Sequence, residues 1–522
     1  MAHFPIRFLT LSHPSNAVVR LACALAIVSS VSGEARSQGS AAPAQRDAAE
    51  GETMALVGAT VIDVATGARH ADQVVVVKGG RVREVVPRAA WRRTGGLRVV
   101  GVEGRFIIPG LWDMHVEQAL PERDGAPLDS NARLFHPLFL ASGVTGVRDV
   151  AGDVSVLRRW RTAIERGERL GPRIVYTGPK IGMAPVAPGL PHPLRSREDV
   201  EATVQALQAA GATGVYLLSL DDALIPVLAA ASRRHGLRLE GSVPEGETLA
   251  RQLEAGQSVV EHLDDILASC AADESVRWKV RAYRERPWWA RALWKAGVWE
   301  RSEYPDALLL PSFSQARAES LFARLAKAGV YQVPTLRLMG VLGRSADSAV
   351  RLPPAPLELR PPRNAWRGWA REPEPVGHPL SRIFARQQWV VGAMARAGVP
   401  ILAGSDTPNL YAAPGLALHD ELELLVRAGL SPLQALQSAT LRPAEYLAAT
   451  DSLGTVAPGR VADLVVLQGD PTRDIRNTRR VEMVMTRGRL LDAAALARLR
   501  AQGTAMAREV EAYWIARPGS GP

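Results

Sequence analysis

The sequence predicts an α/β protein, a (β/α)8 TIM-like barrel with a small β-sandwich domain built from both chain ends. Three observations predict this fold. Short apolar strands alternate with helical segments through the middle of the chain, eight such strands occur, and both flanks consist of strands and turns. A chain of 522 residues, 47% of them hydrophobic, is long enough to bury one large core and a smaller one.

Residues 1–54 are predicted to be a signal peptide and a disordered leader. An apolar run at residues 21–28 follows Arg7 and Arg20, and small residues and then a polar stretch come after it. The run is too short to span a bilayer, and no later run reaches about 18 uninterrupted apolar residues. We therefore expect an exported protein, periplasmic or secreted, with no integral membrane segment after signal removal. An unprocessed leader is the alternative.

The cysteines and charges limit the expected partners. Cys23 lies in the leader and Cys270 is left alone, so we expect no intramolecular disulfide. The 63 basic residues exceed the 53 acidic ones, but they are mostly arginines scattered along the chain. We therefore expect a small-molecule substrate and no nucleic-acid partner. An anionic substrate and an oligomer are both compatible with this composition.

The two flanks are predicted to form one composite β-domain, from residues 55–110 and 452–495, because neither flank alone has enough strands to bury a face. Gly79-Gly80 marks a hairpin turn between two of the strands. The predicted strands are 55–57, 60–64, 74–78, 81–86, 462–467, 481–486 and 488–491. A C-terminal helix and tail are expected at residues 496–522.

The middle of the chain, residues 111–451, is predicted to form the barrel. Its expected strands are 107–111, 144–150, 173–177, 214–218, 238–241, 259–262, 331–335 and 400–404. Two long inserts, at about 263–329 and 340–379, are rich in tryptophan and are expected to act as lids, because long loops of such barrels lie over the active face. Alternatively, these tryptophans pack helices onto the barrel or form an interface.

The segment IIPGLWDMH at residues 107–115 resembles the Pro-Gly-hydrophobic-x-Asp-x-His signature of the first barrel strand in the amidohydrolase superfamily. Further segments resemble later strands and the closing pattern of this family, in the family's order. They are GVTGVRD at 143–149, GPRI at 171–174, VEH at 260–262, LAGSD at 402–406 and GTVAPGRVADL at 454–464. The resemblance covers about residues 55–495 and points to the imidazolonepropionase-like and prolidase-like branch.

The resemblance implies a metal centre with an incomplete ligand set. A divalent metal that activates water needs imidazole and carboxylate ligands converging at strand ends. His115, His262 and Asp406 match family ligands, whereas the second histidine of the first strand falls on Glu117. Two further ligand positions are degenerate: Tyr216 stands where the family has a bridging lysine, and Ser242 where it has a histidine.

We therefore expect one divalent metal, with zinc as the first choice, held by His115, Glu117, His262 and Asp406. Asp406 would also be the catalytic residue, acting as base and then as acid. Without a metal, His115 would be a core histidine, Asp406 the cap of a turn, and Glu117 a polar pocket residue or an ion-pair partner.

Three other residues receive weaker assignments. Arg148 and His419 are expected to support the ligands from behind, with an internal ion pair and a packing histidine as the respective alternatives. Lys180, just beyond the third barrel strand, is the only lysine near the end of a predicted barrel strand. We do not favour it as a displaced bridging lysine.

The leading functional prediction is an amidohydrolase-like enzyme that hydrolyses a carbon–nitrogen bond in an amide, cyclic amide or small peptide-like compound. The main alternative is a catalytically inactive binding or scaffold protein that has lost its metal and has no cofactor. A third reading is metal-free acid–base catalysis by Tyr216 and Glu117. The fold cannot decide among these readings, because one fold supports many functions.

Overall fold

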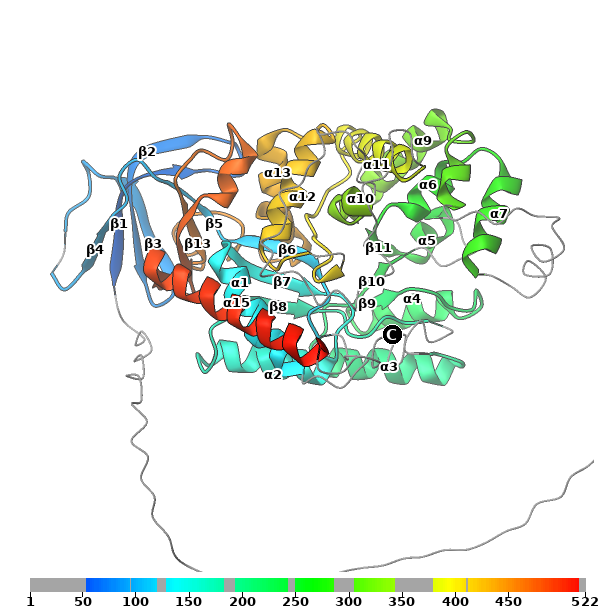
Figure 1. The fold of residues 1–522 in the computed structure, drawn as a ribbon, viewed down its shortest axis with the longest axis horizontal. Coiled ribbons are helices and arrows are strands. Elements are labelled where there is room, and N and C mark those ends of the chain that lie inside the picture. Colours follow the sequence, from blue (N-terminus) through cyan, green and yellow to red (C-terminus); the bar gives the residue numbers. More distant parts are fainter. Residues whose placement is uncertain are drawn as a thin grey trace, which may run out of the picture. The chain divides into compact units, whose positions relative to one another are not determined.

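The computed structural model describes residues 53–93, 95–119, 128–182, 193–242, 249–285, 305–342, 379–409 and 412–515 (Figure 1). All of these lie in one compact unit, residues 47–522. The predicted leader, the tryptophans at 288–299 and nearly all of the second predicted insert lie outside the described residues. Because a single unit contains both predicted domains, the boundaries between them stay a prediction.

Strands from both ends of the chain share one eight-stranded sheet. Its order is β15-β14-β13-β5-β1-β2-β3, with β4 also paired to β1. The strands are β1 (Met54–Ile62), β2 (Arg69–Lys78), β3 (Arg81–Pro87), β4 (Arg98–Gly101), β5 (Phe106–Pro109), β13 (Leu464–Leu467), β14 (Val481–Thr486) and β15 (Arg489–Leu491). Strand β5 joins the two ends because it runs parallel to β1 and antiparallel to β13. The predicted sandwich of two sheets is not confirmed.

The hairpin predicted at Gly79-Gly80 is confirmed. Strands β2 and β3 pair antiparallel, with Lys78 opposite Arg81. Gly79 and Gly80 have φ values of +57° and +70°, which glycine adopts without the steric cost that a side chain would impose.

Seven parallel strands lie in two sheets beside this one, and helices connect them. One sheet contains β6 (Leu111–Val116), β7 (Val144–Asp149) and β8 (Arg173–Tyr176); the other contains β9 (Gly214–Leu217), β10 (Arg238–Gly241), β11 (Gln257–Glu261) and β12 (Tyr331–Val333). Isolated parallel bridges join Ile181 to Leu217, Gln332 to Ile401 and Val116 to Thr407. The α/β class is thus confirmed, whereas a closed barrel stays a prediction, because no continuous ladder of eight strands is present among the described residues.

Two predicted barrel strands need correction. The apolar run at 107–111 is not one strand: β5 ends at Pro109 in the eight-stranded sheet, and β6 begins at Leu111 in the parallel one. The chain changes sheet at Gly110, where a Cβ atom would lie 1.9 Å from Thr145 Oγ1. The strand predicted at 400–404 is present only as the single bridge at Ile401, because the chain there makes only scattered ladder contacts.

Helices alternate with the parallel strands and cover them, as Figure 1 shows for α2, α3 and α4 beside β7 to β9. The helices are α1 (Leu128–Ala141), α2 (Val154–Glu165), α3 (Arg197–Ala209), α4 (Ile225–Arg234), α5 (Leu249–Ala255), α6 (Asp264–Cys270), α7 (Glu274–Glu285), η1 (Pro305–Leu309), α9 (Gln315–Ala328), α10 (Leu336–Leu342), α11 (Pro379–Arg396), α12 (Leu416–Arg427), α13 (Pro432–Ser438), α14 (Leu441–Tyr446), η5 (Ile475–Arg479) and α15 (Ala493–Ile515). Helix α2 begins after Asp153, whose carboxylate accepts the backbone N–H groups of Ser155 and Val156. Helix α15 packs on the end of α1 through Leu496, Leu499 and Leu140.

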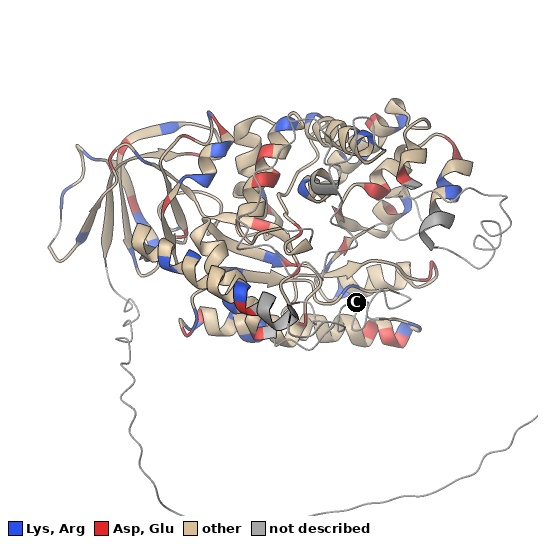
Figure 2. Ribbon diagram, in the orientation of Figure 1, with Lys and Arg blue, Asp and Glu red and all other residues tan. Residues whose placement is uncertain are grey.

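The described residues contain no helix long and apolar enough to cross a membrane. Cys270 is buried and forms no disulfide with any residue that the structure describes. Acidic and basic residues are interspersed along the helices and strands in Figure 2. The predicted absence of a nucleic-acid partner is untested and stays a prediction.

Candidate metal centre

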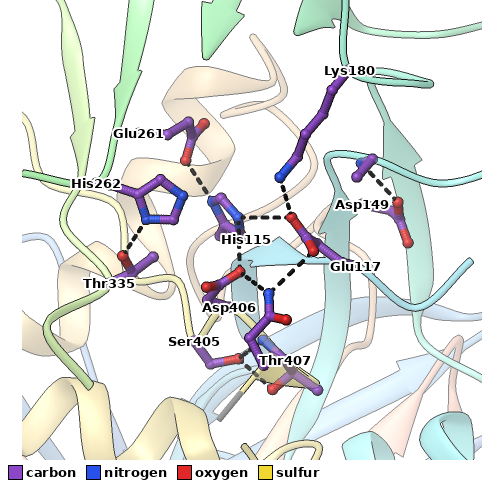
Figure 3. A network of polar contacts seen from close by, with 12 residues as sticks. His115, Glu117, Asp149, Lys180, Glu261, His262, Thr335, Ser405, Asp406 and Thr407 are labelled. Carbon is purple, nitrogen blue, oxygen red and sulfur yellow. Dashed lines mark hydrogen bonds and ion pairs between the residues drawn. The ribbon is translucent and has the colours of Figure 1, made fainter. Parts of the chain in front are cut away.

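His115, near the end of β6, lies at the centre of a buried polar network (Figure 3). Its Nδ1 is 2.7 Å from Glu261 Oε2, and because an ionised carboxylate only accepts hydrogen bonds, this contact places a proton on Nδ1. Its Nε2 lies 3.2 Å from Asp406 Oδ1 and makes no hydrogen bond to a described residue. A buried imidazole nitrogen without a hydrogen bond is a suitable metal ligand.

His262, which follows β11, faces His115 with 4.8 Å between the ring centres. Its Nδ1 lies 2.7 Å from Thr335 Oγ1, on the loop after β12. When Nδ1 donates to this hydroxyl, Nε2 is left with a free lone pair. Both imidazoles are therefore held through Nδ1, the usual way in which a protein orients a histidine that binds metal through Nε2.

Asp406 completes a three-residue group. Its backbone N–H donates to the carbonyl of His115 at 2.9 Å, and its Oδ1 accepts a hydrogen bond from Asn409 Nδ2 at 2.9 Å. One ligand atom from each of His115, His262 and Asp406 lies within 4.8 Å of the others. Two imidazoles and one carboxylate with an open position are a donor set that suits a catalytic divalent metal. The residues present therefore fit one such ion.

Three residues of this centre have left-handed backbone conformations. The φ values are +59° for His262, +47° for Thr335 and +57° for Asp406. A residue with a side chain costs roughly 1–2 kcal/mol in this region relative to ordinary conformations. The surrounding fold therefore imposes these conformations on two of the candidate ligands, His262 and Asp406, and on Thr335, which contacts His262.

Glu117 lies beside the three-residue group but has other partners. Its Oε1 is 3.8 Å from His115 Nε2 and accepts a hydrogen bond from Lys180 Nζ at 2.5 Å. Its Oε2 accepts one from Asn409 Nδ2 at 3.1 Å. The predicted ligand is thus close to the centre, with both oxygens engaged by the protein.

The two degenerate positions lie on neighbouring strands. Tyr216 on β9 is buried, its ring lies 5.2 Å below Lys180 Nζ, and its hydroxyl has no hydrogen-bond partner among the described residues. Ser242 follows β10 and donates its backbone N–H to the carbonyl of Leu217 at 3.0 Å. The side chain at the bridging-lysine position is therefore a phenol that contacts an ammonium group.

Arg148 on β7 makes a buried ion pair, which was its alternative interpretation, and through Glu261 it is also linked to His115. Its Nη2 lies 2.7 Å from Glu261 Oε1 and 2.5 Å from Glu240 Oε2, and all three side chains are fully buried. Tyr446 donates to the other oxygen of Glu240 at 2.5 Å. A continuous chain of contacts therefore runs from Glu240 through Arg148 and Glu261 to His115.

The network shifts the acidity of its members. Burial alone would lower the pKa of His115, but the Glu261 carboxylate raises it well above its ordinary value. Burial and the nearby His115 charge lower the pKa of His262 to about 4. Burial would raise the pKa of Glu117, but the charge of Lys180 lowers it below its usual range. Burial would lower the pKa of Lys180, but the Glu117 carboxylate raises it above its usual range. Burial raises the pKa of Tyr216, so its phenol stays protonated.

His419 does not contact these ligands. Its Nδ1 lies 2.9 Å from Thr478 Oγ1 in η5, and its Nε2 lies 3.0 Å from the carbonyl of Ser142 before β7. Burial lowers its pKa to about 3. His419 therefore packs between η5 and the segment before β7, which was its alternative interpretation. It was expected to support the ligands, and it does not contact them.

Three residues of the centre were missed by the sequence prediction: Glu261, Thr335 and Asn409. Glu261 had a signal, because it is an acidic residue inside an apolar strand next to His262. Thr335 and Asn409 follow strand ends, where polar residues are common, and nothing in the sequence distinguishes them from caps. Lys180 was considered in another role, as a displaced bridging lysine, and its contact with Glu117 was not foreseen.

The comparisons with known proteins agree with the predicted resemblance. Residues 381–491 match the model of the Amidohydrolase family. Among solved structures, a putative prolidase from Bifidobacterium longum has a TM-score of 0.59 at 20% identity and covers 87% of this chain and 99% of its own. A Xaa-Pro dipeptidase with bound methionine has a TM-score of 0.62 at 18% identity, covering 84% of this chain and all of its own. Bottromycin amidohydrolase has a TM-score of 0.65 at 20% identity, covering 87% and 90%.

Similarity to curated sequences is confined to a short stretch. An adenine deaminase of Ligilactobacillus salivarius (strain UCC118) is 40% identical over 68 residues, and adenine deaminase 2 of Jannaschia sp. (strain CCS1) is 42% identical over 60 residues. These matches span 13% and 12% of this chain and 12% and 10% of the relatives. These short matches show nothing about the substrate of this chain. The family model agrees with the predicted resemblance over residues 381–491, and the solved structures share the fold.

Proposed function

We propose that this chain of the amidohydrolase superfamily hydrolyses a carbon–nitrogen bond in a small amide, cyclic amide or peptide-like substrate, with one divalent metal. The observation that carries the proposal is the convergence of His115, His262 and Asp406, whose ligand atoms lie within 4.8 Å of one another. The position of His115 Nε2 supports it, because this fully buried nitrogen makes no hydrogen bond to a described residue and lies 3.2 Å from Asp406 Oδ1.

The first contribution of the protein is to orient the imidazoles of His115 and His262. Glu261 holds the proton on His115 Nδ1, and Thr335 holds His262 Nδ1, so both imidazoles direct Nε2 at the same point. A bound divalent ion supplies Lewis-acid polarisation of the carbonyl and a water of lowered pKa. Such pre-organisation matters because small misplacements of reacting groups have large effects on rate.

Asp406 is the proposed proton carrier. It is 3% exposed, and its carboxylate faces the point toward which both imidazoles are directed. We propose that it accepts a proton from the attacking water and delivers it to the leaving nitrogen. Asn409 fixes the carboxylate by donating to Oδ1, which keeps it in position through both transfers.

A binding or scaffold protein without metal is the second candidate. It is favoured by the tyrosine and serine at the degenerate positions and by the engagement of Glu117 with Lys180. The third reading, acid–base catalysis by Tyr216 and Glu117, has no support in their acidity. Burial raises the pKa of Tyr216, while Lys180 opposes burial and lowers that of Glu117, so neither side chain would exchange protons near neutral pH.

Metal analysis separates the first two candidates. The full chain would be purified without chelator, supplemented with Zn²⁺ or Mn²⁺, desalted and assayed for metal and for hydrolysis of dipeptides and N-acyl amino acids. We expect one ion per chain and activity in the parent protein, loss of both in His262→Ala, and neither loss in His235→Ala. His235 is a matched control because its imidazole pairs with Glu201 at the surface. A parent protein that takes up no metal would favour the scaffold.

Export is a separate proposal, which rests on the apolar run at residues 21–28. Expression of the full chain in a Gram-negative host should yield a shortened protein in the periplasmic fraction. Mass spectrometry of that protein would locate the new N-terminus. Recovery of only the full-length chain from the cytoplasm would contradict the proposal.

A further inference from the structure

We propose that Lys180 takes the place of a second metal ion, so that the centre is built for one divalent ion and one ammonium group. The inference rests on the proposed function for its metal, and it adds a positioning residue to it. Figure 3 shows the Lys180 side chain reaching the Glu117 carboxylate, which lies between it and Asp406.

The backbone places Lys180 firmly. The next residue, Ile181, donates its N–H to the carbonyl of Tyr216 at 2.8 Å and accepts the N–H of Leu218 at 2.9 Å. This parallel bridge fixes the loop after β8 against β9. The Lys180 side chain therefore starts beside Tyr216, and its Nζ lies over the Tyr216 ring, 5.2 Å from the ring centre. An aromatic face at this distance favours a cation.

The contact with Glu117 is an ion pair with a short hydrogen bond. Lys180 Nζ donates to Glu117 Oε1 at 2.5 Å, and an ammonium group that donates to a carboxylate makes one of the stronger hydrogen bonds in proteins. Asn409 occupies the other oxygen of Glu117 at 3.1 Å. Lys180 and Asn409 therefore engage both oxygens of Glu117, which is the only one of the three substituted ligand positions with a carboxylate.

The charges of the network agree with a single ion. Four carboxylates lie along the chain of direct contacts: Glu240, Glu261, Asp406 and Glu117. Two cationic side chains, Arg148 and Lys180, face them. When both imidazoles bind the ion they are neutral, so the four carboxylates then exceed the two cationic side chains by two negative charges, which one divalent ion balances. A second ion would leave an excess of positive charge in a buried site, where uncompensated charge is costly.

The test is a double-mutant cycle in which the affinity for metal is measured. The full-length parent chain, Lys180→Met, Glu117→Gln and the double variant would be titrated with Mn²⁺ and Zn²⁺ by calorimetry, and metal content would be measured after desalting. Lys180→Met frees Glu117 as a fourth ligand, so the first ion should bind at least about tenfold more tightly. Glu117→Gln leaves the lysine charge unbalanced, so the ion should bind at least about tenfold more weakly.

The double variant should return close to the parent affinity, because both changes act through one pair. Lys327→Met is the control, since Lys327 lies exposed on α9. Circular dichroism would check folding, and Lys180→Gln, which removes the charge but keeps a polar group, replaces Lys180→Met if that variant does not fold. A purely structural role would weaken metal binding in both single variants and would overturn the proposal.

Other outcomes separate the two proposals. A parent protein with two ions per chain overturns this inference and leaves the proposed hydrolase intact, as does an unchanged affinity in Lys180→Met and Lys180→Gln. A parent protein without metal, with uptake in Lys180→Met, contradicts the proposed function and supports Lys180 as the group that excludes an ion from Glu117. Absence of metal from every variant overturns both.

Discussion

Glu261 and His115 are joined by a fully buried contact of 2.7 Å between a carboxylate oxygen and imidazole Nδ1, across residues that are 146 positions apart in the sequence. This contact fixes which imidazole nitrogen carries the proton. It also links the candidate ligand to Arg148, which holds the other oxygen of the same carboxylate.

Replacement of Glu261 by glutamine should therefore weaken metal binding without removing a ligand. An amide can present its N–H₂ group to Nδ1, which moves the imidazole proton to Nε2 and blocks the metal. We expect the dissociation constant for Zn²⁺ to rise about 10- to 100-fold, measured by competition with a chromophoric chelator. Glu254→Gln on the exposed face of α5 is the control. Equal affinity in Glu261→Gln and the parent would show that this contact does not control the imidazole.

Arg148→Met tests the stability of the buried network. The change leaves Glu240 and Glu261 without their shared cation in a fully buried place. We expect the free energy of unfolding to fall by about 3–5 kcal/mol in urea titrations. Arg159→Met, which breaks an exposed pair with Asp129, should cost about 1 kcal/mol or less. Similar losses for the two variants would mean that the buried charges relax or are hydrated.

Glu421 on α12 should make stability depend on pH. It accepts the backbone N–H groups of Leu336 and Arg337, and burial raises its pKa to about 8 despite these bonds. The folded chain then keeps a proton that the unfolded chain loses near pH 4.5. This contribution is complete below about pH 4.5 and is lost as the pH rises through about 8.

Glu421→Gln removes this titration. Between pH 5 and 8.5, the parent protein should lose about 2–4 kcal/mol more unfolding free energy than the variant does. Urea midpoints at the two pH values measure the difference, and Glu198→Gln, in the exposed first turn of α3, should behave as the parent. Parallel pH profiles for Glu421→Gln and the parent would falsify the raised pKa.

Gly110→Ala tests the point at which the chain changes sheet. The added Cβ would lie 1.9 Å from Thr145 Oγ1, closer than atoms can approach, so we expect a loss of about 1–3 kcal/mol in unfolding free energy. Gly95→Ala should be near neutral, because nothing lies within 4 Å of its added Cβ. Thr145→Ala in the Gly110→Ala background should recover part of the loss. A fully stable Gly110→Ala variant would mean that β6 and β7 separate easily.

Local patterns predicted much of this structure. The Gly79-Gly80 turn and the alternation of strands and helices depend on neighbouring residues, so the sequence was sufficient to predict them. The break at Gly110 was missed because both sides of it are apolar and buried, and only the packing of Thr145 requires a glycine there.

The sequence predicted those residues of the candidate centre whose backbone position alone places the side chain near the others. His115, His262 and Asp406 were expected to meet, and the structure brings them together. The pairing of Lys180 with Glu117 could not be read in the same way. The lysine stem has four rotatable bonds, and its tip is placed by the contact of the following residue with β9, which only the folded chain contains.

The left-handed conformations of His262, Thr335 and Asp406 have a consequence for engineering. Glycine at any of these positions would relieve roughly 1 kcal/mol or more of backbone strain while deleting a group of the centre. A directed-evolution search that rewards only heat resistance would therefore gain by dismantling the centre. If variants are selected for thermal stability without a screen for metal binding or turnover, we expect these three residues to be replaced.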